Sequence, residues 1–242
     1  MVNKTSNVEG LFEDFKNQIK SIFGAELLSI YLYGSAARDE YIQGKSDINF
    51  LVIIQSDGLT NLSEVWEYLP RLRKLGIATP LVLTRSYVDS SLDTFPLEFL
   101  NMMEANSLIY GEAVLEELEI NNDHLRLQIE RELKSKLLSL RQGYMETLGS
   151  RDGLENLISI SLTAFTAIFR GTLYIKNVDT DKGDSLKVFK LIEDTFKLRK
   201  GVFKDLYDVK MEVSKMNTAE LISLTEEYME AVRTIFKRVD EL

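Results

Sequence analysis

The sequence contains no cysteine, and His124 is the only histidine among its 242 residues. The lack of cysteine excludes disulfide bonds, thiol catalysis and cysteine-based zinc sites, and it is typical of proteins from a reducing compartment. A single histidine has no second histidine with which to share a metal ion. Because His124 follows Asn121-Asn122-Asp123 at an expected helix start, a role in the capping turn is favoured over catalysis.

Long apolar runs are also missing. The first ten residues lack the apolar core of a signal peptide. The most apolar helix-like run, Leu157 to Phe169, contains Ser and Thr and is shorter than the roughly 20 residues that cross a bilayer. We therefore expect a cytoplasmic protein with no membrane partner.

Positive charge is in the minority, with 29 basic against 38 acidic side chains and a formal net charge of −9. Such a surface repels nucleic-acid phosphates on average, so we expect no long nucleic acid as a partner. One expected helix carries Arg126, Arg131 and Lys134, but Glu130 and Glu132 intervene. This alternation of charge is typical of a solvated, salt-bridged helix surface.

One short stretch of the chain is suited to anion binding. The apolar run Leu27 to Tyr33 predicts a buried strand, and Gly34-Ser35 then turns the chain into a short helix that begins near Ala36. A turn of this kind presents backbone N–H groups and a hydroxyl to an anion. The stretch therefore predicts a site at the end of the first strand.

A second strand is expected over Ile48 to Ile54, opened by Ser46-Asp47-Ile48-Asn49. Strand side chains alternate between faces, so Asp47 and Asn49 are expected to point the same way. The sequence thus predicts two oxygen ligands that project together beside the Gly34 turn.

Each of these residues also has an ordinary structural role. Gly34 and Ser35 suit a strand-to-helix turn with Ser35 as the helix cap, and Arg38 then suits a solvated helix residue. Asp47 suits a turn cap, and Asn49 suits a hydrogen bond to the loop backbone. The joint spacing of the five residues favours a ligand site over these separate roles.

The stretch resembles the nucleotidyltransferase superfamily that includes DNA polymerase beta and kanamycin nucleotidyltransferase. The signature of that family is Gly-Ser, a nearby Arg, and Asp-x-Asp on the next strand, and the matching residues are Gly34, Ser35, Arg38, Ser46 and Asp47. The resemblance implies that Gly34, Ser35, Arg38 and Ser46 bind a nucleoside triphosphate and that Asp47 is catalytic, holding Mg²⁺. In the family, a third carboxylate on a later strand completes one metal site and helps to deprotonate the acceptor hydroxyl.

The chain departs from the family at two places. Asn49 stands where the second Asp is expected, and its amide oxygen can ligate Mg²⁺ but brings no negative charge. The later strand, Thr79 to Thr84, contains no acid. Asp93 and Glu98 are the nearby acids that could compensate. We therefore expect Mg²⁺ to bind weakly or not at all, at Asp47 and Asn49.

The chain divides near residue 120. The fold expected is α+β: a nucleotidyltransferase-type mixed β-sheet flanked by helices over residues 1–119, followed by an all-α helical bundle over residues 120–242. The first part has expected helices over 8–23, 61–76 and 96–105, the second of them bent or ended by Pro70, and further strands near 81–84 and 107–110. In the second part, apolar stripes predict long helices, the first two over 125–148 and 154–173.

Kanamycin-type enzymes share this layout, and in them the bundle helps to form the acceptor pocket and the dimer. The resemblance therefore implies a homodimer and a small-molecule or protein acceptor. Related helical domains of the HEPN class carry an Arg-plus-His ribonuclease motif, but no His follows Arg170 within residues 171–176. Ribonuclease activity is not expected.

Two functions remain open on the sequence. One is transfer of a nucleoside monophosphate from a nucleoside triphosphate to a small-molecule or protein hydroxyl, at a rate that is low or lost. The alternative is a catalytically inactive nucleotide-binding or protein-interaction module. The missing carboxylates lower the expected rate but leave a pocket, since nucleotidyl transfer depends on positioning and on metal neutralisation of charge.

Overall fold

The structure is a computed structural model that describes residues 5–38, 40–42, 46–180 and 184–241. The chain forms two compact units: residues 1–93 with 102–119, and residues 94–101 with 120–242. Each unit buries its own apolar cluster. Residues 94–101, which the sequence assigned to the first part, pack with the second unit.

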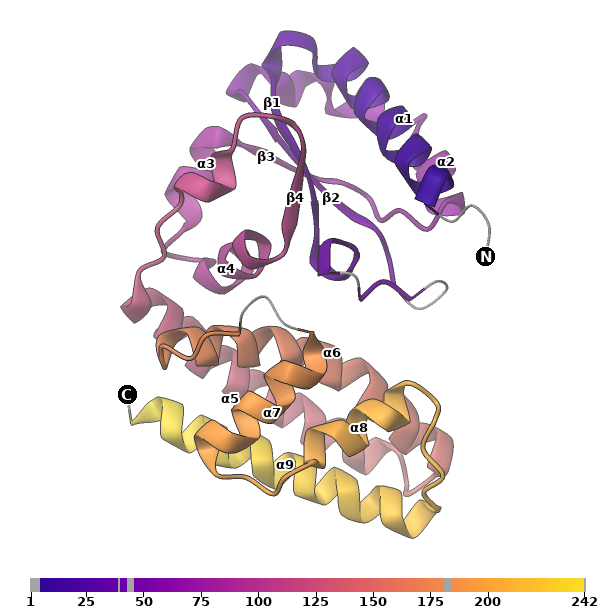
Figure 1. Ribbon diagram of the computed structural model, residues 1–242, viewed down its shortest axis with the longest axis vertical. Helices are drawn as coiled ribbons and strands as arrows, with labels where there is room; N and C mark the ends of the chain where they lie inside the picture. Colours follow the sequence, from indigo (N-terminus) through magenta and orange to yellow (C-terminus); the bar gives the residue numbers. More distant parts are fainter. Residues whose placement is uncertain (1–4, 39, 43–45, 181–183, 242) are drawn as a thin grey trace. The chain divides into compact units, whose positions relative to one another are not determined.

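A four-stranded mixed sheet forms the centre of the first unit (Figure 1). Its strands are β1 (Leu27–Tyr33), β2 (Asn49–Ile54), β3 (Leu81–Thr84) and β4 (Asn106–Gly111), in the order β3-β2-β1-β4. β1 is antiparallel to both β2 and β4, whereas β2 and β3 are parallel. The expected mixed sheet is confirmed.

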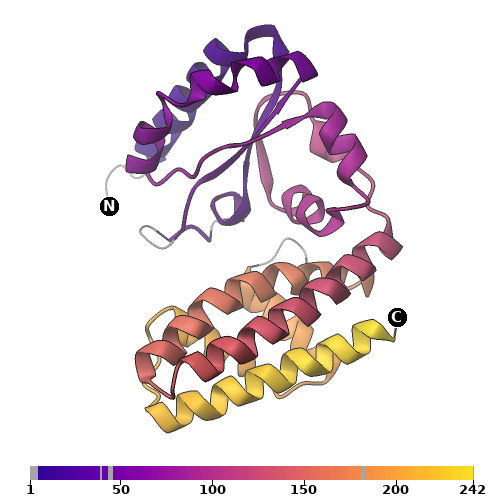
Figure 2. The same cartoon turned by 180° about the vertical axis from the view of Figure 1, so that it is seen from behind.

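Helices cover one face of this sheet: α1 (Thr5–Phe23), the 3₁₀ helix η3 (Ser56–Val65) and α2 (Leu69–Lys74), as Figures 1 and 2 show. Phe15 of α1 stacks on Phe50 of β2, with 4.0 Å between ring centroids. Alternation along the strands sends every second side chain to this face. The other buried strand residues of the same cluster are Leu27, Ile30, Leu32, Val52 and Ile54.

Pro70 corrects one expectation about these helices. The sequence predicted a single helix from Asn61 to Gly76 that Pro70 bends or ends. The structure instead has η3 and then α2, and Pro70 lies in the first turn of α2. Proline lacks an N–H but has a helical φ, so it is tolerated where the first N–H groups of a helix have no partner. Pro70 therefore begins a helix.

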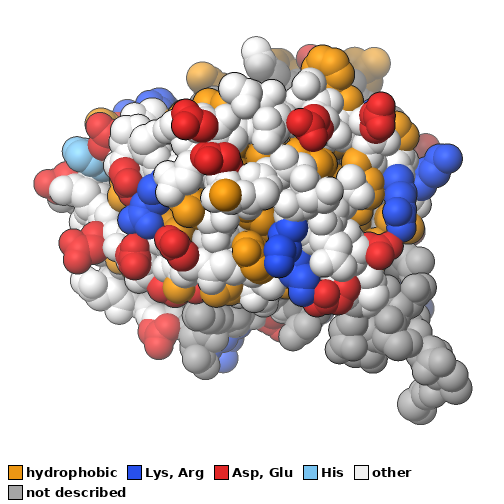
Figure 3. Space-filling model, turned by 90° about the horizontal axis from the view of Figure 1, so that it is seen from above, with side chains coloured by type: hydrophobic (Ala, Val, Ile, Leu, Met, Phe, Trp, Pro, Cys, Tyr) orange, Lys and Arg blue, Asp and Glu red, His pale blue; other side chains and the backbone are white. Residues whose placement is uncertain are grey.

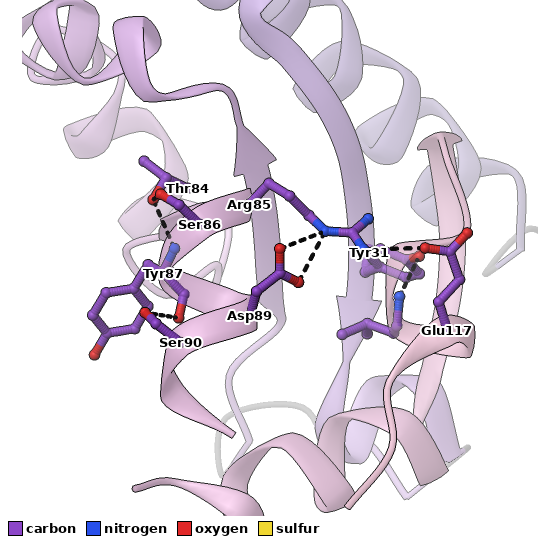
Figure 4. Close-up of polar contacts among 9 residues, drawn as sticks. Tyr31, Thr84, Arg85, Ser86, Tyr87, Asp89, Ser90 and Glu117 are labelled. Carbon is purple, nitrogen blue, oxygen red and sulfur yellow. Dashed lines mark hydrogen bonds and ion pairs between the residues drawn. The ribbon is translucent and has the colours of Figure 1, made fainter. Parts of the chain in front are cut away.

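Helix α3 (Arg85–Ser91) follows β3 directly and was not expected from the sequence. Thr84 ends β3 and caps the helix, because its hydroxyl accepts a hydrogen bond from the Tyr87 N–H at 3.1 Å (Figure 4). Arg85 holds the helix to the segment after β4, with Nη2 at 3.2 Å from the Glu117 carboxylate and Nε at 3.1 Å from Asp89.

Tyr31 lies on the sheet face opposite α1 and is fully buried. Its hydroxyl accepts a hydrogen bond from the Leu115 N–H at 3.1 Å and donates toward the Glu116 carboxylate and the Glu112 carbonyl, at 3.0 and 3.1 Å. Burial, together with the Glu116 carboxylate, raises the pKa of Tyr31 to about 12, although the Leu115 N–H opposes this. Tyr31 thus anchors the 3₁₀ helix η4 (Val114–Glu117) to the sheet.

The second unit is helical: α5 (Asn122–Glu146), α6 (Arg151–Ile175), α7 (Ser185–Phe196), α8 (Val202–Lys210) and α9 (Thr218–Asp240). Their apolar stripes meet in one buried cluster. Four of the five helices begin with a polar cap whose side chain accepts a first-turn N–H, namely Asn121, Ser150, Asp184 and Asn217. The helical region expected after residue 120 is confirmed.

His124 lies in the first turn of α5, where its N–H donates to the Asn121 side chain at 3.2 Å. The fifth helix, α8, has no side-chain cap at Gly201. The buried Glu193 carboxylate of α7 replaces that cap by accepting the N–H groups of Gly201 and Phe203, at 2.7 and 2.9 Å.

Helix α6 is the one helix in the described ranges whose length and composition would let it cross a membrane. It has 25 residues, more than the run Leu157 to Phe169 that the sequence suggested. Half of its most apolar window is buried, as in the core helix of a bundle.

Candidate functional site

Sheet pairing brings the two halves of the motif together. Tyr33 is the last residue of β1 and lies directly opposite Asn49, the first residue of β2. On its other side, Tyr33 lies opposite Asn106, the first residue of β4. Residues directly opposite in antiparallel strands have neighbouring side chains on one face. A polar row, Asn49-Tyr33-Asn106, therefore crosses this end of the sheet just before the Gly34 turn.

The short helix expected near Ala36 is a 3₁₀ helix, η2 (Gly34–Arg38), which begins at the turn itself. Gly34 has φ +79°, a left-handed conformation that glycine adopts without strain. Its N–H donates to the Ala105 carbonyl at 3.0 Å. Because Gly34 is tied to Ala105 and the chain leaves the turn by residue 40, only a short 3₁₀ segment fits.

The Asn49 side-chain amide lies near this turn. A Cβ atom on Gly34 would stand 3.5 Å from the Asn49 Nδ2, so β2 begins close to the turn. The same Nδ2 donates to the main-chain oxygen of Asp47 at 3.3 Å. The amide nitrogen is thus directed at its own chain.

Asp47 is exposed and precedes β2 by two residues. Ile48 between them forms a parallel bridge with Ile77 and is buried in the cluster under α1. Alternation from Ile48 directs Asp47 and Asn49 to the opposite face. The Asp47 carboxylate forms no ion pair with another described residue.

Ser46 and Ser35 differ in their contacts. Ser46 closes the segment after Ile42, since its hydroxyl accepts the Ile42 N–H at 3.2 Å and its N–H donates to the Ile42 carbonyl at 2.8 Å. The Ser35 carbonyl accepts the Glu40 N–H at 3.0 Å. The Ser35 hydroxyl has no hydrogen bond to a described residue. Ser46 therefore has a structural contact, whereas the hydroxyl of Ser35 is available to a ligand.

Arg38 is not a solvated helix residue. Its side chain is only 7% exposed, and its Nη2 lies 3.7 Å from the Oε2 of Glu104, the last residue of α4 (Pro96–Glu104). Glu104 directly precedes Ala105, whose carbonyl accepts the Gly34 N–H. Two consecutive residues therefore contact the first and the last residue of η2. Sequence reasoning missed Glu104 because nothing in the local pattern links the end of a helix to an arginine in an earlier turn.

The potential metal ligands are few. Strand β3 places Leu81 opposite Leu51, on the same face as Asn49, and no residue of β3 is acidic. Glu98 accepts a hydrogen bond from Gln128 at 2.6 Å within the second unit. A compensating role for Asp93 or Glu98 stays a prediction. No group of three or more His, Asp or Glu residues suited to a metal ion occurs in the described part of the chain.

This donor set fits Mg²⁺ only in part. The sheet face opposite α1, which carries Tyr33 and Asn49, is called the motif face. On it the described motif residues offer one carboxylate, from Asp47, and one amide oxygen, from Asn49. Mg²⁺ sites of this type combine one or two carboxylates with substrate phosphates and water. Asp47 and Asn49 would therefore hold the ion only together with phosphate oxygens.

The surface charge is mixed. Acidic and basic side chains are interspersed on the face drawn in Figure 3. On α5, Arg126 and Lys134 both pair with Glu130, with Arg126 Nη1 at 3.3 Å from the carboxylate. The salt-bridged helix surface predicted from the charge alternation is confirmed at these residues.

A scan against protein-family models found no match, and neither did a search of curated proteins. A search of solved structures found a likeness to spectinomycin adenyltransferase AAD(9) from Enterococcus faecialis, whose crystal structure contains ATP and spectinomycin. The TM-score is 0.52 at 14% sequence identity, over 91% of this chain and 99% of the other. At this identity the likeness establishes the fold. The protein has the α+β architecture of a nucleotidyltransferase, with a mixed sheet and a helical C-terminal region.

Proposed function

We propose that this protein binds a nucleoside triphosphate at the Gly34–Ser35 turn and slowly transfers its nucleoside monophosphate to a hydroxyl group of a small molecule. The observation that carries the proposal is the pairing of Tyr33 with Asn49, which sets the start of β2 beside the Gly34 turn. The likeness to an adenyltransferase solved with ATP and a small-molecule acceptor supports both substrate classes.

The residues of the turn would hold the triphosphate. The Ser35 hydroxyl donates to a phosphate oxygen, and the Arg38 guanidinium supplies the positive charge. Asp47 and Asn49 would hold Mg²⁺ with the phosphates, and the ion would neutralise charge that develops during transfer. The oxygen of the acceptor hydroxyl forms the new bond to the α-phosphorus and its proton passes to water, while the bond from the α-phosphorus to the bridging oxygen breaks and pyrophosphate leaves.

A low rate follows from the charge at position 49. Nucleotidyl transfer depends on positioning and on neutralisation of phosphate charge, and here an amide replaces a carboxylate. Among the described motif residues, Asp47 alone offers the ion a negative charge. Weak ion binding leaves more charge uncompensated in the transition state, so binding should be easier to detect than turnover.

Binding and transfer are tested separately. ATP, CTP, GTP and UTP, each with Mg²⁺, are titrated calorimetrically and in thermal-unfolding scans; a ligand at 100 times its Kd stabilises a fold by about 2.7 kcal/mol. Transfer is measured with α-³²P-labelled triphosphates and a panel of hydroxyl-rich aminocyclitols. Binding of none of the four at millimolar concentration contradicts the proposal, and binding without transfer favours an inactive nucleotide-binding module.

The matched control is an exposed aspartate at the other end of β2. Asp57 lies in the first turn of η3, after the strand, whereas Asp47 lies before it. Asp57→Ala removes the same charge from the same unit and is expected to leave nucleotide affinity unchanged. Asp47→Ala is expected to weaken Mg²⁺-dependent affinity.

A further inference from the structure

Two tyrosines of β1 lie on the same face of the sheet but have different surroundings. Tyr31 and Tyr33 are two residues apart, so their side chains share a face. The Tyr31 hydroxyl contacts Leu115, Glu116 and Glu112. The Tyr33 hydroxyl has no hydrogen bond to any residue that the structure describes. The Tyr31 hydroxyl therefore forms hydrogen bonds within the fold, whereas the Tyr33 hydroxyl forms none with the described residues.

Tyr33 is half-buried, and solvent still reaches its hydroxyl oxygen. Its ring makes no contact with another aromatic ring among the described side chains. Because no described residue bonds to this hydroxyl, it is open to water or to a ligand. A ligand could supply its partner.

The position of Tyr33 indicates which ligand. It directly precedes Gly34, so its backbone leads into the turn, and it lies opposite Asn49 in the polar row. Its other neighbour, Asn106, is committed to the end of α4, since its amide donates to the Met102 and Met103 carbonyls at 2.9 and 3.0 Å. Tyr33 is therefore the member of the row that adjoins the turn and has an uncommitted donor.

A tyrosine hydroxyl keeps its proton at neutral pH, since its ordinary pKa is about 10. A protonated phenol donates a hydrogen bond and carries no charge that would repel an anion. Hydrogen bonds from such donors to ionised oxygens are short and about twice as strong as those between neutral groups.

We infer that Tyr33 is a ligand-binding residue whose hydroxyl donates a hydrogen bond to a phosphate oxygen of the nucleoside triphosphate. The inference rests on the proposed function, since it places the phosphates at the Gly34–Ser35 turn. Tyr33 of β1 is then a third phosphate-binding group, an uncharged donor beside the hydroxyl of Ser35 and the charged guanidinium of Arg38. Tyr33 then contributes to phosphate affinity without contributing to the stability of the fold.

The test is Tyr33→Phe, which keeps the ring and removes only the hydroxyl. The affinity for Mg²⁺-ATP, measured by calorimetry, is expected to fall about tenfold or more, as for loss of a hydrogen bond to a charged group. Inorganic tripolyphosphate, which lacks base and ribose, is expected to lose the same factor. An unchanged ATP affinity, or a loss for ATP but not for tripolyphosphate, overturns the inference.

Tyr31→Phe is the matched control on the same strand and face. It is expected to lower the thermal stability and to leave ATP affinity unchanged, because its hydroxyl contacts only protein groups. Tyr33→Phe is expected to leave the thermal stability unchanged. If Tyr33→Phe instead destabilises the protein as Tyr31→Phe does, the hydroxyl has a structural role and the inference is wrong.

The failure of the inference is distinguishable from that of the proposed function. Wild-type protein that binds no triphosphate contradicts both. Wild-type binding that Tyr33→Phe leaves intact contradicts only the assignment of Tyr33. Wild-type binding that falls with Tyr33→Phe and not with Tyr31→Phe supports both.

Discussion

The side chain of Asn49 lies next to Gly34: its Nδ2 is 3.5 Å from the position that a Cβ atom on Gly34 would occupy. The first residue of β2 is therefore close to the turn that follows β1.

Gly34→Ala tests the geometry of the turn. Gly34 has φ +79°, so a side chain is strained there whatever space is available, at a cost of about 1 to 2 kcal/mol. We expect the free energy of unfolding in urea to fall by that amount and nucleotide affinity to fall with it. Gly10→Ala is the control, because that glycine has no such φ and a Cβ atom there meets nothing within 4 Å.

Asn49→Asp restores a carboxylate on the motif face of β2. We expect Mg²⁺-dependent nucleotide affinity to rise several-fold, because a negative charge is added where Asp47 already contributes one. Little transfer activity should return, since β3 still carries no acid. Titrations of ATP with and without Mg²⁺ measure the effect. If Asn49→Asp and Asp47→Ala both leave it unchanged, this strand is not a metal site.

Glu104→Gln removes the carboxylate beside Arg38 while keeping its shape. A largely buried guanidinium then loses the negative charge of Glu104 beside it, so we expect the free energy of unfolding to fall by about 1 to 3 kcal/mol. Glu117→Gln is the control, since it breaks the more exposed pair with Arg85, where a change under about 1 kcal/mol is expected. Equal effects in urea unfolding would show that Glu104 does not secure the turn.

Tyr31 gives the protein a dependence on alkaline pH. Its pKa is about 12 in the folded chain against an ordinary value of 10.0, so folding favours the protonated phenol. The contribution of the protonated Tyr31 to the free energy of unfolding is fully present below pH 10 and is lost as the pH rises toward 12. Its size is at most roughly 3 kcal/mol, since one pKa unit corresponds to about 1.4 kcal/mol and the shift is about two units.

The measurement is the difference in unfolding free energy between wild type and Tyr31→Phe from pH 8 to pH 12. Other tyrosines titrate in both proteins and cancel in the difference. We expect wild type to be more stable at pH 8 and its advantage to shrink above pH 10. A constant difference would show that the Tyr31 hydroxyl is not protonated preferentially in the folded state.

Several elements follow from local sequence alone. The run Leu27–Tyr33 is β1 with the bounds expected, and the strand expected near Leu81 is β3. The long apolar stripes are α5 and α6. Apolar periodicity predicts these elements because the spacing of apolar residues along the chain shows whether one face or both faces of a helix or strand are buried. It also predicted a mixed sheet followed by a helical region.

Local signals were less reliable where two structures compete over a few residues. Pro70 was expected to bend or end a helix and instead lies in the first turn of α2, since its fixed φ suits a first turn as well as a break. The helix expected at Ala36 is the five-residue η2. α3 was missed because Thr84 belongs to β3 and also caps the helix that follows.

The sequence by itself determined the strands, the long helices and the motif residues Gly34, Ser35 and Asp47. Only the tertiary structure placed Glu104 beside Arg38 and Tyr33 opposite Asn49. It also distinguished Tyr33 from Tyr31, although both are tyrosines on one face of one strand. The physical reason is that a side chain's partners come from segments distant in the chain, and strand pairing and loop closure decide which segments meet.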